Sequence, residues 1–443
     1  MFDSLLIANR GEIARRINRT ARRMGITTVA VCSDVDVDLP HVTEADRHVV
    51  LGPADPASSY LDIDAILAAA EETGARAVHP GYGFLSEKAD FARAVLAAGL
   101  VWVGPDPDAI TAMGDKINAR NLMSRHGVPV APGGGDPVVD ADAAIAVADR
   151  IGYPVMVKAA AGGGGMGMAI AADPAELATQ ADRIHGFASR LFGSGDLLIE
   201  RYYPRVRHIE VQILGLPDGR VLALGERECS VQRRHQKLVE ETPSPAVDPA
   251  LRERLLDASV RAGRAVDYRG AGTVEYLLDV DTGDFFFLEM NTRLQVEHPI
   301  TELVTGIDLV EAQLRIAAGE DPGIGEPTIT GHAVELRVNA EDPKRFLPGP
   351  GTITAWQEPT GPGVRVDSGY RSGDTVPRFY DSLMAKVVMH GADRAQALER
   401  ARAAVAAFTI EGPKSNLAFH AELLDNDEFV SGNYDTAIVG RMR

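Results

Sequence analysis

Strand-like and helix-like patterns alternate through the first 110 residues, and this alternation limits the possible folds more than any other feature of the sequence. Short apolar runs typical of buried strands occur at residues 4–9, 27–34, 76–81 and 100–105. Apolar residues at helical spacing lie between these runs, at residues 12–25, 60–74 and 90–99. Such a series predicts an α/β fold with a parallel sheet and helices on both of its faces.

The turn after the first apolar run disfavours a dinucleotide site. A nicotinamide or flavin dinucleotide needs the pattern G-x-G-x-x-G at this turn, because its glycines let the backbone cradle the pyrophosphate. The sequence there is ANRGEIA, with the single glycine Gly11. The first unit is therefore predicted to follow a Rossmann-like chain path without binding a dinucleotide.

Proline and glycine cluster at residues 128–140, and this cluster predicts a boundary between parts of the chain. A small unit follows, to about residue 203. Beyond it strand and helix patterns mix. Antiparallel strands are predicted at residues 351–359, 363–369 and 380–391, and a helix is predicted at residues 393–408.

Charge and composition exclude several classes of function. The 443 residues carry a formal net charge of −18, which disfavours binding to nucleic acid or to an anionic membrane. The sequence has no run of about 18 apolar residues, so no membrane-spanning helix is predicted. The two cysteines, Cys32 and Cys229, are too few for a disulfide framework or a zinc site. We expect a cytoplasmic protein in which both are reduced.

The run YPVMVKAAAGGGGMGM predicts a phosphate-binding loop. A strand pattern in it ends at Lys158, and the consecutive glycines Gly162, Gly163, Gly164 and Gly165 follow. Glycine lets the backbone approach a ligand closely and point N–H groups at it. The lysine beside the loop suits a phosphate chain, although the G-K-[ST] ending of a P-loop is absent. A flexible surface loop is the alternative.

The run TVEYLLDVDTGDFFFLEMN predicts a β-hairpin over residues 273–291. We expect DTG to form a three-residue loop with Gly283 in the left-handed conformation, so that Asp284 pairs with Val280. A two-residue loop is the alternative. It would place the acidic residues of the two strands on opposite faces.

In the expected register, Glu275 lies directly opposite Glu289 on one face of the hairpin, and Asn291 is two residues further along on the same face. Two carboxylates placed so close together repel each other unless a cation lies between them. Together with an amide oxygen they form a hard-cation site that suits Mg²⁺ with substrate phosphates.

Residues 227–237, RECSVQRRHQK, hold four basic residues and one histidine against a single acid. In a chain with an excess of acidic residues, this stretch predicts a local anion site. A solvated turn with ordinary salt bridges is the alternative.

Taken together, these motifs resemble those of the biotin carboxylases. The runs YPVMVKAAAGGGGMG and FLEMNTRL are similar to the ATP-site segments of ATP-grasp carboxylases and carbamoyl-phosphate synthetases. IANRGEIA, HPGYGFLSE, GDK, ECSVQRRHQK, MNTRLQVEHPITE and ELRVNAEDP resemble biotin carboxylase in order along nearly the whole chain. The resemblance implies an ATP-grasp fold with a Rossmann-like N-terminal domain (1–114), a connecting segment (115–130), a lid domain with the glycine-rich loop (131–203), and a catalytic core with a C-terminal mixed domain (204–443).

The resemblance also implies ligands for individual residues. Those expected to bind ATP are Lys116, Lys158, Gly163, Gly164, Gly165, Glu200, His208, Gln232 and His235. Those expected to bind Mg²⁺ (one or two ions, or Mn²⁺) are Glu275, Glu289 and Asn291. Those expected to bind bicarbonate are Lys237, Arg293, Gln295, Val296 (through its backbone) and Glu297. Family members often have five glycines and an arginine in the loop, where this chain has Ala161 and Met166.

The implied reaction converts ATP, bicarbonate and biotin to carboxybiotin, ADP and phosphate, the first half-reaction of an acyl-CoA carboxylase. Bicarbonate is a poor nucleophile, so it must be held and deprotonated before it attacks ATP. The expected catalytic residues are Lys237, Arg293, Glu297 and Arg337. The fork of Arg293 matches a planar anion, and Glu297 is the expected general base. The carboxyphosphate formed releases CO₂ beside biotin, and Arg337 is expected to stabilise the biotin enolate.

The implied partners are a biotin carboxyl carrier protein or domain, a carboxyltransferase subunit and a second copy of the chain. This chain is not expected to carry biotin itself. A carrier presents its lysine as A-M-K-M in a turn, whereas SLMAKVVMH places Lys386 inside an alternating apolar strand. The sequence ends at Arg443 with no further domain to hold a carrier, so biotin is expected to arrive on a separate protein or on a region outside this sequence.

Two alternative functions are another ATP-grasp ligase that activates bicarbonate or a carboxylate, and a non-catalytic ATP-binding subunit. Dependence of ADP release on biotin would separate the first alternative from biotin carboxylase. The presence of Lys237, Arg293 and Glu297 together disfavours the second, because binding of ATP alone does not require them.

Overall fold

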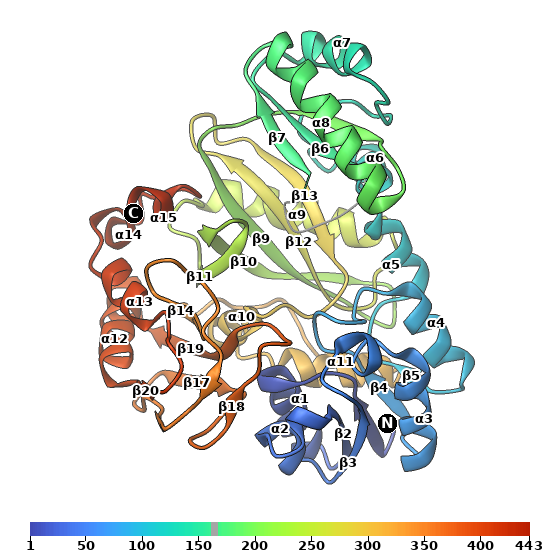
Figure 1. Ribbon diagram of the computed structural model, residues 1–443, viewed down its shortest axis with the longest axis vertical. Coiled ribbons are helices and arrows are strands. Elements are labelled where there is room, and N and C mark those ends of the chain that lie inside the picture. The colour runs from blue at the N-terminus through green and yellow to red at the C-terminus, as the bar shows by residue number, and fades with distance from the viewer. Residues whose placement is uncertain (161–166) are drawn as a thin grey trace.

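The computed structural model describes residues 1–160 and 167–443. Its N-terminal part is a parallel sheet covered by helices (Figure 1). The strands lie in the order β3 (Arg47–Gly52), β2 (Thr27–Ser33), β1 (Ser4–Ile7), β4 (Ala77–His79) and β5 (Val101–Trp102). The helices that follow these strands include α1 (Gly11–Arg23), α2 (Pro40–Thr43), α3 (Ile63–Thr73) and α4 (Ala89–Ala97). This arrangement confirms the predicted α/β class.

The central strand β1 explains why helices cover both faces of this sheet. Leu5 and Ile7 pack in one hydrophobic cluster with α1, whereas Leu6 packs in another with α3 and α4. Alternate residues of a strand point to opposite faces, so a continuous apolar run needs cover on both sides. The edge strand β3 was not predicted, because its residues are exposed or half-buried and therefore lack that apolar run.

The small unit has a sheet and a hydrophobic core of its own. Two helices, α5 (Pro107–Gly114) and α6 (Lys116–Arg125), lead to it. Its elements are α7 (Ala141–Ile151), β6 (Val155–Ala159), β7 (Met168–Ala171), α8 (Pro174–Phe192) and β8 (Leu197–Arg201), with the antiparallel strand order β7-β6-β8. Figure 1 shows this unit at the top of the molecule. Gly163, Gly164 and Gly165, with Ala161 and Met166, lie outside the described residues.

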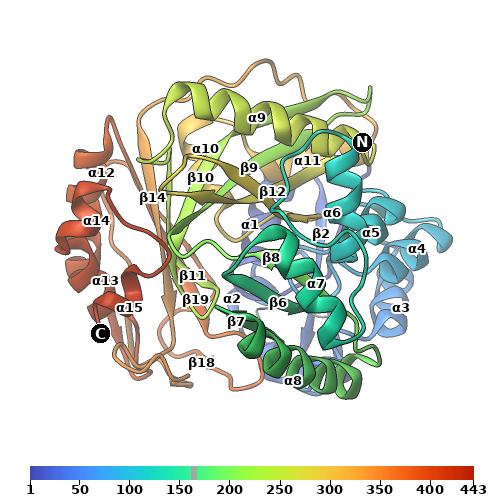
Figure 2. The ribbon, with the colours of Figure 1, turned by 90° about the horizontal axis from the view of Figure 1, so that it is seen from above.

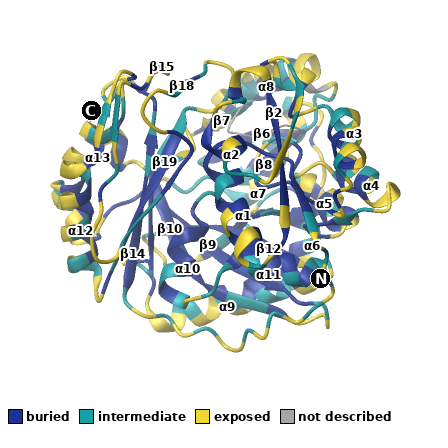
Figure 3. Cartoon of the chain, turned by 90° about the horizontal axis from the view of Figure 1, so that it is seen from below, coloured by how far each residue is buried: buried dark blue, intermediate teal, exposed yellow. Residues whose placement is uncertain are grey.

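A large antiparallel sheet forms the centre of the molecule. Its order is β13 (Phe285–Asn291), β12 (Gly270–Asp279), β9 (Val206–Gly215), β10 (Val221–Arg233), β11 (Gln236–Thr242), β14 (His332–Asn339), β19 (Leu383–Gly391) and β17 (Val364–Ser368). Because β11 pairs with β14, one continuous sheet joins the region after residue 203 to the C-terminal region. Figure 3 shows that the strands of this sheet are largely buried.

Helices cover this large sheet and connect its strands. They are α9 (Pro249–Arg264), α10 (His298–Thr305), α11 (Leu309–Ala317), α12 (Arg394–Ala407), α13 (Leu417–Leu424), α14 (Asp427–Ser431) and α15 (Ile438–Arg441). Seen from above, α12 to α15 lie on the side of the sheet opposite to α7 and α8 (Figure 2). Among the described residues, no helix combines the length and apolar character needed to cross a membrane.

The predicted strand at residues 351–359 is split in the structure. It forms β15 (Gly351–Thr352) and β16 (Ala355–Gln357), which pair outside the large sheet with β18 (Thr375–Val376) and β20 (Thr409–Glu411). By contrast, the other two predicted C-terminal strands and the predicted helix correspond to β17, β19 and α12. An apolar alternation indicates a strand but does not identify its partner.

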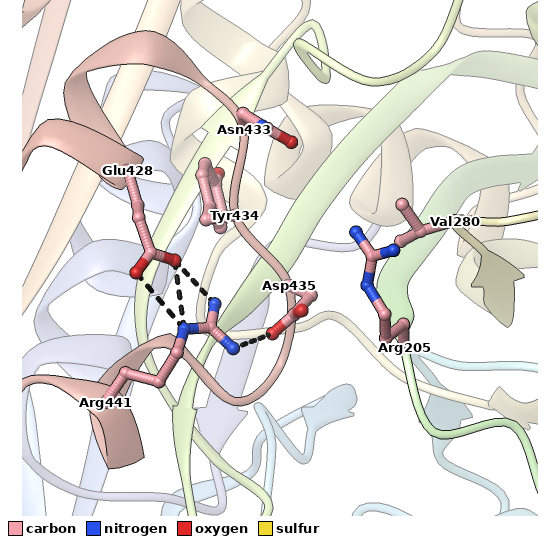
Figure 4. A pocket seen from close by; sticks show the side chains of 7 residues that line it. All are labelled: Arg205, Val280, Glu428, Asn433, Tyr434, Asp435 and Arg441. Carbon is pink, nitrogen blue, oxygen red and sulfur yellow. Dashed lines mark hydrogen bonds and ion pairs between the residues drawn. The ribbon is translucent and has the colours of Figure 1, made fainter.

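The C-terminal helices are held by ion pairs around a polar cavity of about 300 Å³ (Figure 4). Arg441 of α15 pairs with Glu428 of α14 at 2.6 Å and with Asp435 at 2.8 Å. Arg205 lines the same cavity and pairs with Asp281 at 2.7 Å. Arg441 therefore joins α15 to α14 and to Asp435, while Arg205 joins two loops of the large sheet beside the same cavity.

Candidate active site

Four adjacent strands of the large sheet place a row of charged residues side by side. Arg227 of β10 pairs with Glu210 of β9, Glu210 pairs with Glu275 of β12, and Glu275 pairs with Glu289 of β13. Residues directly opposite each other in a sheet share one face. Three glutamates therefore lie next to each other, which is unfavourable without nearby cations.

The hairpin brings Glu275 opposite Glu289, but its loop differs from the predicted one. Asp284 pairs with Asp279 rather than Val280, so the loop has four residues, 280–283. Gly283 is left-handed as expected, with φ of +72°. This register alone would place Glu275 opposite Leu288.

A β-bulge in β13 restores the opposition of the two acids. Tyr276 pairs with Phe287 and Glu275 pairs with Glu289, which leaves Leu288 as the extra residue between them. Bulges re-aim side chains next to functional sites. The predicted facing of the acids is therefore present, for a reason that the loop alone does not supply.

Lys237 of β11 provides the cation that this row requires. Its Nζ lies 2.5 Å from Glu210 Oε2, 2.8 Å from Glu275 Oε1 and 2.7 Å from Glu297 Oε1. Burial disfavours the charged amine, but the three carboxylates outweigh it and hold the pKa of Lys237 well above its ordinary value. We call the residues Glu210, Lys237, Glu275, Glu297 and Arg337 the sheet cluster.

Glu297 is held between two cations at the start of α10. Besides Lys237, Arg337 Nη2 of β14 lies 2.9 Å from Glu297 Oε2. Burial opposes ionisation of Glu297, but Lys237, Arg337 and Arg227 lower its pKa far below the ordinary value. Glu297 is therefore a carboxylate at neutral pH, stabilised in that form by the cations around it.

The second partner of Arg337, Glu240 of β11, was not predicted. Arg337 Nε donates to Glu240 Oε1 at 2.6 Å. Burial raises the pKa of Glu240 to about 7 although the attraction of Arg337 lowers it. Glu240 therefore gains or loses its proton near neutrality, which changes the charge opposite Arg337.

Gln295 is fixed by a buried arginine that the sequence analysis did not single out. Arg227 is fully buried and donates to Glu210 Oε1 at 2.5 Å and to Gln295 Oε1 at 2.9 Å. Gln295 Nε2 in turn donates to Glu275 Oε1 at 2.7 Å. The side chain of Gln295 therefore bridges Arg227 and the row of glutamates.

Arg293 points toward the N-terminal part of the molecule in this structure. Its Nε lies 3.1 Å from Oε2 of Glu87, and its Nη2 donates to Asn291 Oδ1 at 2.9 Å. Burial lowers the pKa of Arg293, but Glu87, Glu297 and Glu275 raise it above the ordinary value. Glu87 was not predicted as a site residue, although it ends the quoted motif HPGYGFLSE.

The predicted metal residues meet on one face of the hairpin and offer hard oxygen donors. Asn291 Nδ2 donates to Glu275 Oε1 at 2.9 Å. Within the described parts of the chain, the side chain of Glu289 makes no hydrogen bond or ion pair. The pKa of the Glu289 carboxyl group is raised mainly by partial desolvation and further by the negative charges of Glu275 and Glu87. A divalent cation would relieve this repulsion, so the residues fit Mg²⁺.

A second group of charged residues faces the metal residues from α6, the small unit and a hairpin turn. Its members are Lys116, Lys158, Glu200 and His235, and we call them the outer cluster. Lys158 Nζ lies 2.5 Å from Glu200 Oε2. Desolvation lowers the pKa of Lys116, as does Lys158, while Glu289 and Glu200 oppose this. The outer cluster therefore interacts electrostatically with Glu289, one of the predicted metal residues.

Strand register places Lys158 and Glu200 on one face of the small sheet. Lys158 pairs with Leu198 and Met156 pairs with Glu200, so the lysine and the glutamate lie diagonally across β6 and β8. Arg120 of α6 lies 3.4 Å from Glu200 Oε1. Glu200 therefore links the small unit to the helix that leads into it.

The two predicted nucleotide histidines have pKa values that shift in opposite directions. Burial lowers the pKa of His208, but Glu275, 2.8 Å from its Nε2, outweighs this and raises it. The pKa of His235 is lowered by burial and then by His208 and Lys158. At neutral pH His235 is therefore neutral and available as a hydrogen-bond acceptor or donor.

His235 and Gln232 belong to a strained hairpin between β10 and β11. Gln232 pairs with Lys237 and Arg233 with Gln236. The two loop residues, Arg234 and His235, have φ of +50° and +66°. Positive φ at both loop positions is the type I′ geometry, which is costly for residues other than glycine, asparagine and aspartate.

The basic stretch at residues 227–237 does not form one anion site. Arg227 is buried against Glu210, and Lys237 belongs to the sheet cluster. Arg233 instead donates to the carbonyl of Arg345, and Arg234 is exposed. The stretch therefore forms a hairpin whose basic side chains have different partners in different parts of the molecule.

Family models match three consecutive segments of the chain. The N-terminal domain of biotin carboxylase matches residues 1–110, the ATP-binding domain of the carbamoyl-phosphate synthase L chain matches residues 115–322, and the C-terminal domain of biotin carboxylase matches residues 335–441. Together they account for nearly the whole chain, and they confirm the ATP-grasp architecture.

Curated relatives agree with these models. A biotin carboxylase of Pseudomonas aeruginosa is 48% identical over 435 residues, which cover 98% of this chain and 96% of that protein. A biotin carboxylase of Nostoc is 47% identical over 100% of this chain and 99% of that protein. The mitochondrial propionyl-CoA carboxylase alpha chain of Sus scrofa is 48% identical over 98% of this chain and 60% of that protein.

Solved structures share the fold of the chain over its whole length. A biotin carboxylase complex with β-γ-ATP from Campylobacter jejuni superposes with a TM-score of 0.96 at 42% identity, covering 100% of this chain and 99% of that chain. The biotin carboxylase domain dimer of Hydrogenobacter thermophilus 2-oxoglutarate carboxylase, in complex with MgADP, ADP and bicarbonate, gives 0.95 at 41% identity, covering 100% and 98%.

Proposed function

The chain belongs to the biotin carboxylase family, and from that premise we propose how its residues divide the reaction. It is an ATP-dependent ligase that uses bicarbonate and Mg²⁺ to carboxylate biotin. The observation that carries the assignment of roles is the position of Lys237, in contact with three glutamates between the predicted metal residues and the predicted base. A single ammonium group there links metal binding to bicarbonate activation.

The outer cluster binds the phosphates of ATP. Lys116 has no ion pair within the described residues, and Lys158 has one carboxylate partner, so both amines can turn to a phosphate chain. Glu200, His208, Gln232 and His235 complete the nucleotide site. Gly163, Gly164 and Gly165 follow β6, and we propose that their N–H groups cover the phosphates.

Glu275, Glu289 and Asn291 would hold Mg²⁺. When bound there, the metal would supply positive charge to neutralise the phosphates of ATP. Asn291 presents its amide nitrogen to Glu275 and its oxygen to Arg293, so a half turn of the amide brings the oxygen toward the carboxylates. The free carboxylate of Glu289 supports this assignment, since it lacks the counter-charge that Glu275 obtains from Lys237.

Lys237, Arg293, Gln295 and the backbone of Val296 bind bicarbonate. Arg293 must turn from Glu87 toward the pocket to do so, and its planar fork then matches a planar anion better than an ammonium group does. Gln295 is fixed by Arg227, which keeps one wall of the pocket rigid. These contacts would hold bicarbonate near the phosphate that it attacks.

Glu297 is the general base, and the cations around it control its strength. In this arrangement Lys237 and Arg337 keep the pKa of Glu297 far below the ordinary value, which makes it a weak base. Bound bicarbonate would share Lys237, and a biotin enolate would share Arg337. Both contacts would weaken the hold on Glu297 and raise its basicity when the substrates are present.

Arg337 stabilises the enolate of biotin after bicarbonate has reacted. It is always protonated, and Glu240 and Glu297 hold it in place at 2.6 Å and 2.9 Å. A cation fixed in advance stabilises developing negative charge without reorganising. Phosphate released from carboxyphosphate removes the ureido proton of biotin.

We also propose the surroundings in which the chain works. The segments 1–114, 115–130, 131–203 and 204–443 act as N-terminal domain, connector, lid and catalytic core with C-terminal domain. Biotin arrives on a carboxyl carrier protein or domain, a carboxyltransferase subunit passes the carboxyl group to an acyl-CoA, and the chain forms a homodimer. The two buried, unpaired cysteines Cys32 and Cys229 support a cytoplasmic location.

The decisive experiment measures ADP release by the purified chain with each substrate omitted in turn. We expect release to require bicarbonate and to rise on addition of a biotinylated carrier. Free biotin should act weakly, because the binding energy of the carrier is missing. ADP release that is indifferent to biotin would instead indicate another bicarbonate- or carboxylate-activating ligase.

A further inference from the structure

Lys386 is a fully buried lysine that the proposed reaction does not use. It lies in β19 with a relative exposure of 0%. A buried charge is expensive unless it is paired and hydrogen-bonded. Lys386 Nζ meets that need by donating to the carbonyl oxygen of Val296 at 2.8 Å and by pairing with Glu12 Oε2 at 3.2 Å.

The contacts of Lys386 come from three separate parts of the chain. Glu12 belongs to α1 of the N-terminal sheet and also accepts a hydrogen bond from Tyr82. Val296 belongs to the turn between β13 and α10. In the large sheet Lys386 pairs with Arg337 on one side and Asp367 on the other. The lysine therefore joins the N-terminal part to the strand that carries Arg337.

The turn at Gln295, Val296 and Glu297 is fixed at both of its inner peptides. The carbonyl of Gln295 accepts from His298 Nδ1 at 2.8 Å, which fixes the peptide that carries the N–H of Val296. The carbonyl of Val296 accepts from Lys386, which fixes the next peptide and with it the direction in which the Glu297 side chain leaves the backbone. His298 is neutral, because burial lowers its pKa well below the ordinary value.

A neutral donor could also bind the carbonyl oxygen of Val296, and it would avoid the free-energy cost of burying the charge of Lys386. Lys386 reaches Val296 from a strand of the large sheet, the rigid element that also carries Arg337 on the neighbouring strand. A charge-assisted hydrogen bond is shorter and stronger than a neutral one. Lys386 and Arg337 lie opposite each other on the paired strands β19 and β14, and Lys386 binds the turn that carries Glu297. This strand pair therefore sets the distance between Glu297 and Arg337.

We propose that Lys386 is a positioning residue for Glu297: by holding the Val296 carbonyl, it aims the carboxylate at bicarbonate. The inference rests on the proposed role of Glu297 as the base. It gives a function to a lysine that fits neither a biotin attachment site, since it is inaccessible, nor an isolated core residue. Lys386 touches no substrate and acts only through the turn.

The test is a double-mutant cycle on ATP cleavage in the presence of bicarbonate and biotinylated carrier. Lys386→Met keeps the length of the side chain and removes the ammonium group. We expect kcat to fall by about 10–100-fold, as is usual for residues that orient a functional group, while the KM for ATP stays within about threefold. In the Glu297→Gln background, Lys386→Met should cause little further loss of kcat.

A purely structural role would give a different pattern. The losses in kcat would then multiply in the double variant, and the KM for ATP would rise together with the fall in kcat. Either result would overturn the proposal, as would a folded Lys386→Met variant with kcat within about threefold of the wild type. Absence of bicarbonate-dependent cleavage in the wild-type chain would instead contradict the proposed function itself.

Two further variants keep the test informative if the single change unfolds the chain. Glu12→Gln combined with Lys386→Met removes the buried carboxylate together with its counterion, and Tyr82 can still donate to the amide oxygen. This double variant should regain stability without regaining kcat. Recovery of both would overturn the proposal. Lys414→Met is the matched control, because Lys414 is exposed and pairs only with Asp342 among the described residues.

Discussion

Lys237 of the sheet cluster and Lys158 of the outer cluster are almost equally exposed, yet they differ in what surrounds them. Their side-chain exposures are 11% and 15%. Lys237 contacts three carboxylates within 2.8 Å, whereas Lys158 contacts one. Depth of burial therefore does not distinguish the two regions, and the number of charged partners does.

This difference separates two tasks within one site. Four members of the sheet cluster lie on strands of the large sheet, and Glu297, at the start of α10, is held between Lys237 and Arg337, so the charges are oriented before substrates bind. The outer cluster comes from α6, the small unit and a hairpin turn, and its lysines have few partners to give up. We expect the sheet cluster to determine chemistry and stability, and the outer cluster to determine nucleotide affinity.

Removing the two lysines in turn tests this division most strongly. Lys237→Met leaves three buried carboxylates without their common cation, so we expect the free energy of unfolding to fall by about 3–5 kcal/mol and ATP cleavage to be lost. Lys158→Met should lower the free energy of unfolding by about 1 kcal/mol or less and mainly raise the KM for ATP. Denaturant unfolding and steady-state kinetics measure both effects. Equal destabilisation by the two changes would remove the distinction between the clusters.

Glu297→Gln separates chemistry from binding within the sheet cluster. It removes the base but keeps the shape, so kcat should fall by about 10²–10⁴-fold while the KM for ATP changes by a few-fold. Arg293→Lys should also lose most activity, because a point charge does not replace a planar fork. Kinetics at saturating ATP with varied bicarbonate measure both changes. Near-normal turnover of either variant would contradict the assigned roles.

Glu275 and Glu289, which lie opposite each other in the hairpin, provide a matched pair of variants. Glu275→Gln and Glu289→Gln should each raise the Mg²⁺ concentration needed for half-maximal activity, by about 10–100-fold. Only Glu275→Gln should also lower the unfolding temperature, since Glu275 is bound by Lys237, Asn291 and Gln295 while Glu289 is unpaired within the described residues. Magnesium titrations and thermal unfolding separate the two effects. Identical behaviour of the pair would show that the partners of Glu275 do not distinguish the two acids.

The last expected effect is a pH dependence of stability from Glu240, whose pKa is raised to about 7 by burial. The pKa in the unfolded chain is about 4.3, so the folded state binds more protons between these values. Stability from this group is therefore complete below about pH 4.3 and is lost as the pH rises through about 7. Glu240→Gln should remove this dependence. Denaturant unfolding at pH 5 to 8 compares the two proteins, and parallel curves would contradict the shift.

Local patterns in the sequence predict local structure well here. The alternating runs of the first 110 residues predict β1, α1 and the parallel sheet, because a strand buried on both faces must be apolar throughout. The spacing of Glu275 and Glu289 predicts a shared face only with a three-residue loop, whereas the observed loop has four residues and a bulge compensates for it. Even there the compensating bulge at Leu288 escaped prediction, since an extra residue in one strand leaves no mark in the apolar pattern.

The motifs of the sequence, through the family that they resemble, determined which residues to expect in the site. Only the tertiary structure decided which of them meet. Lys237 of β11, Arg337 of β14 and Glu297 before α10 converge because β11 pairs with β14 in one continuous sheet. Glu87 and Lys386 reach Arg293 and Val296 from distant parts of the chain. Periodicity determines which way a side chain faces, whereas strand order depends on how all apolar surfaces are buried together, and no local spacing records that.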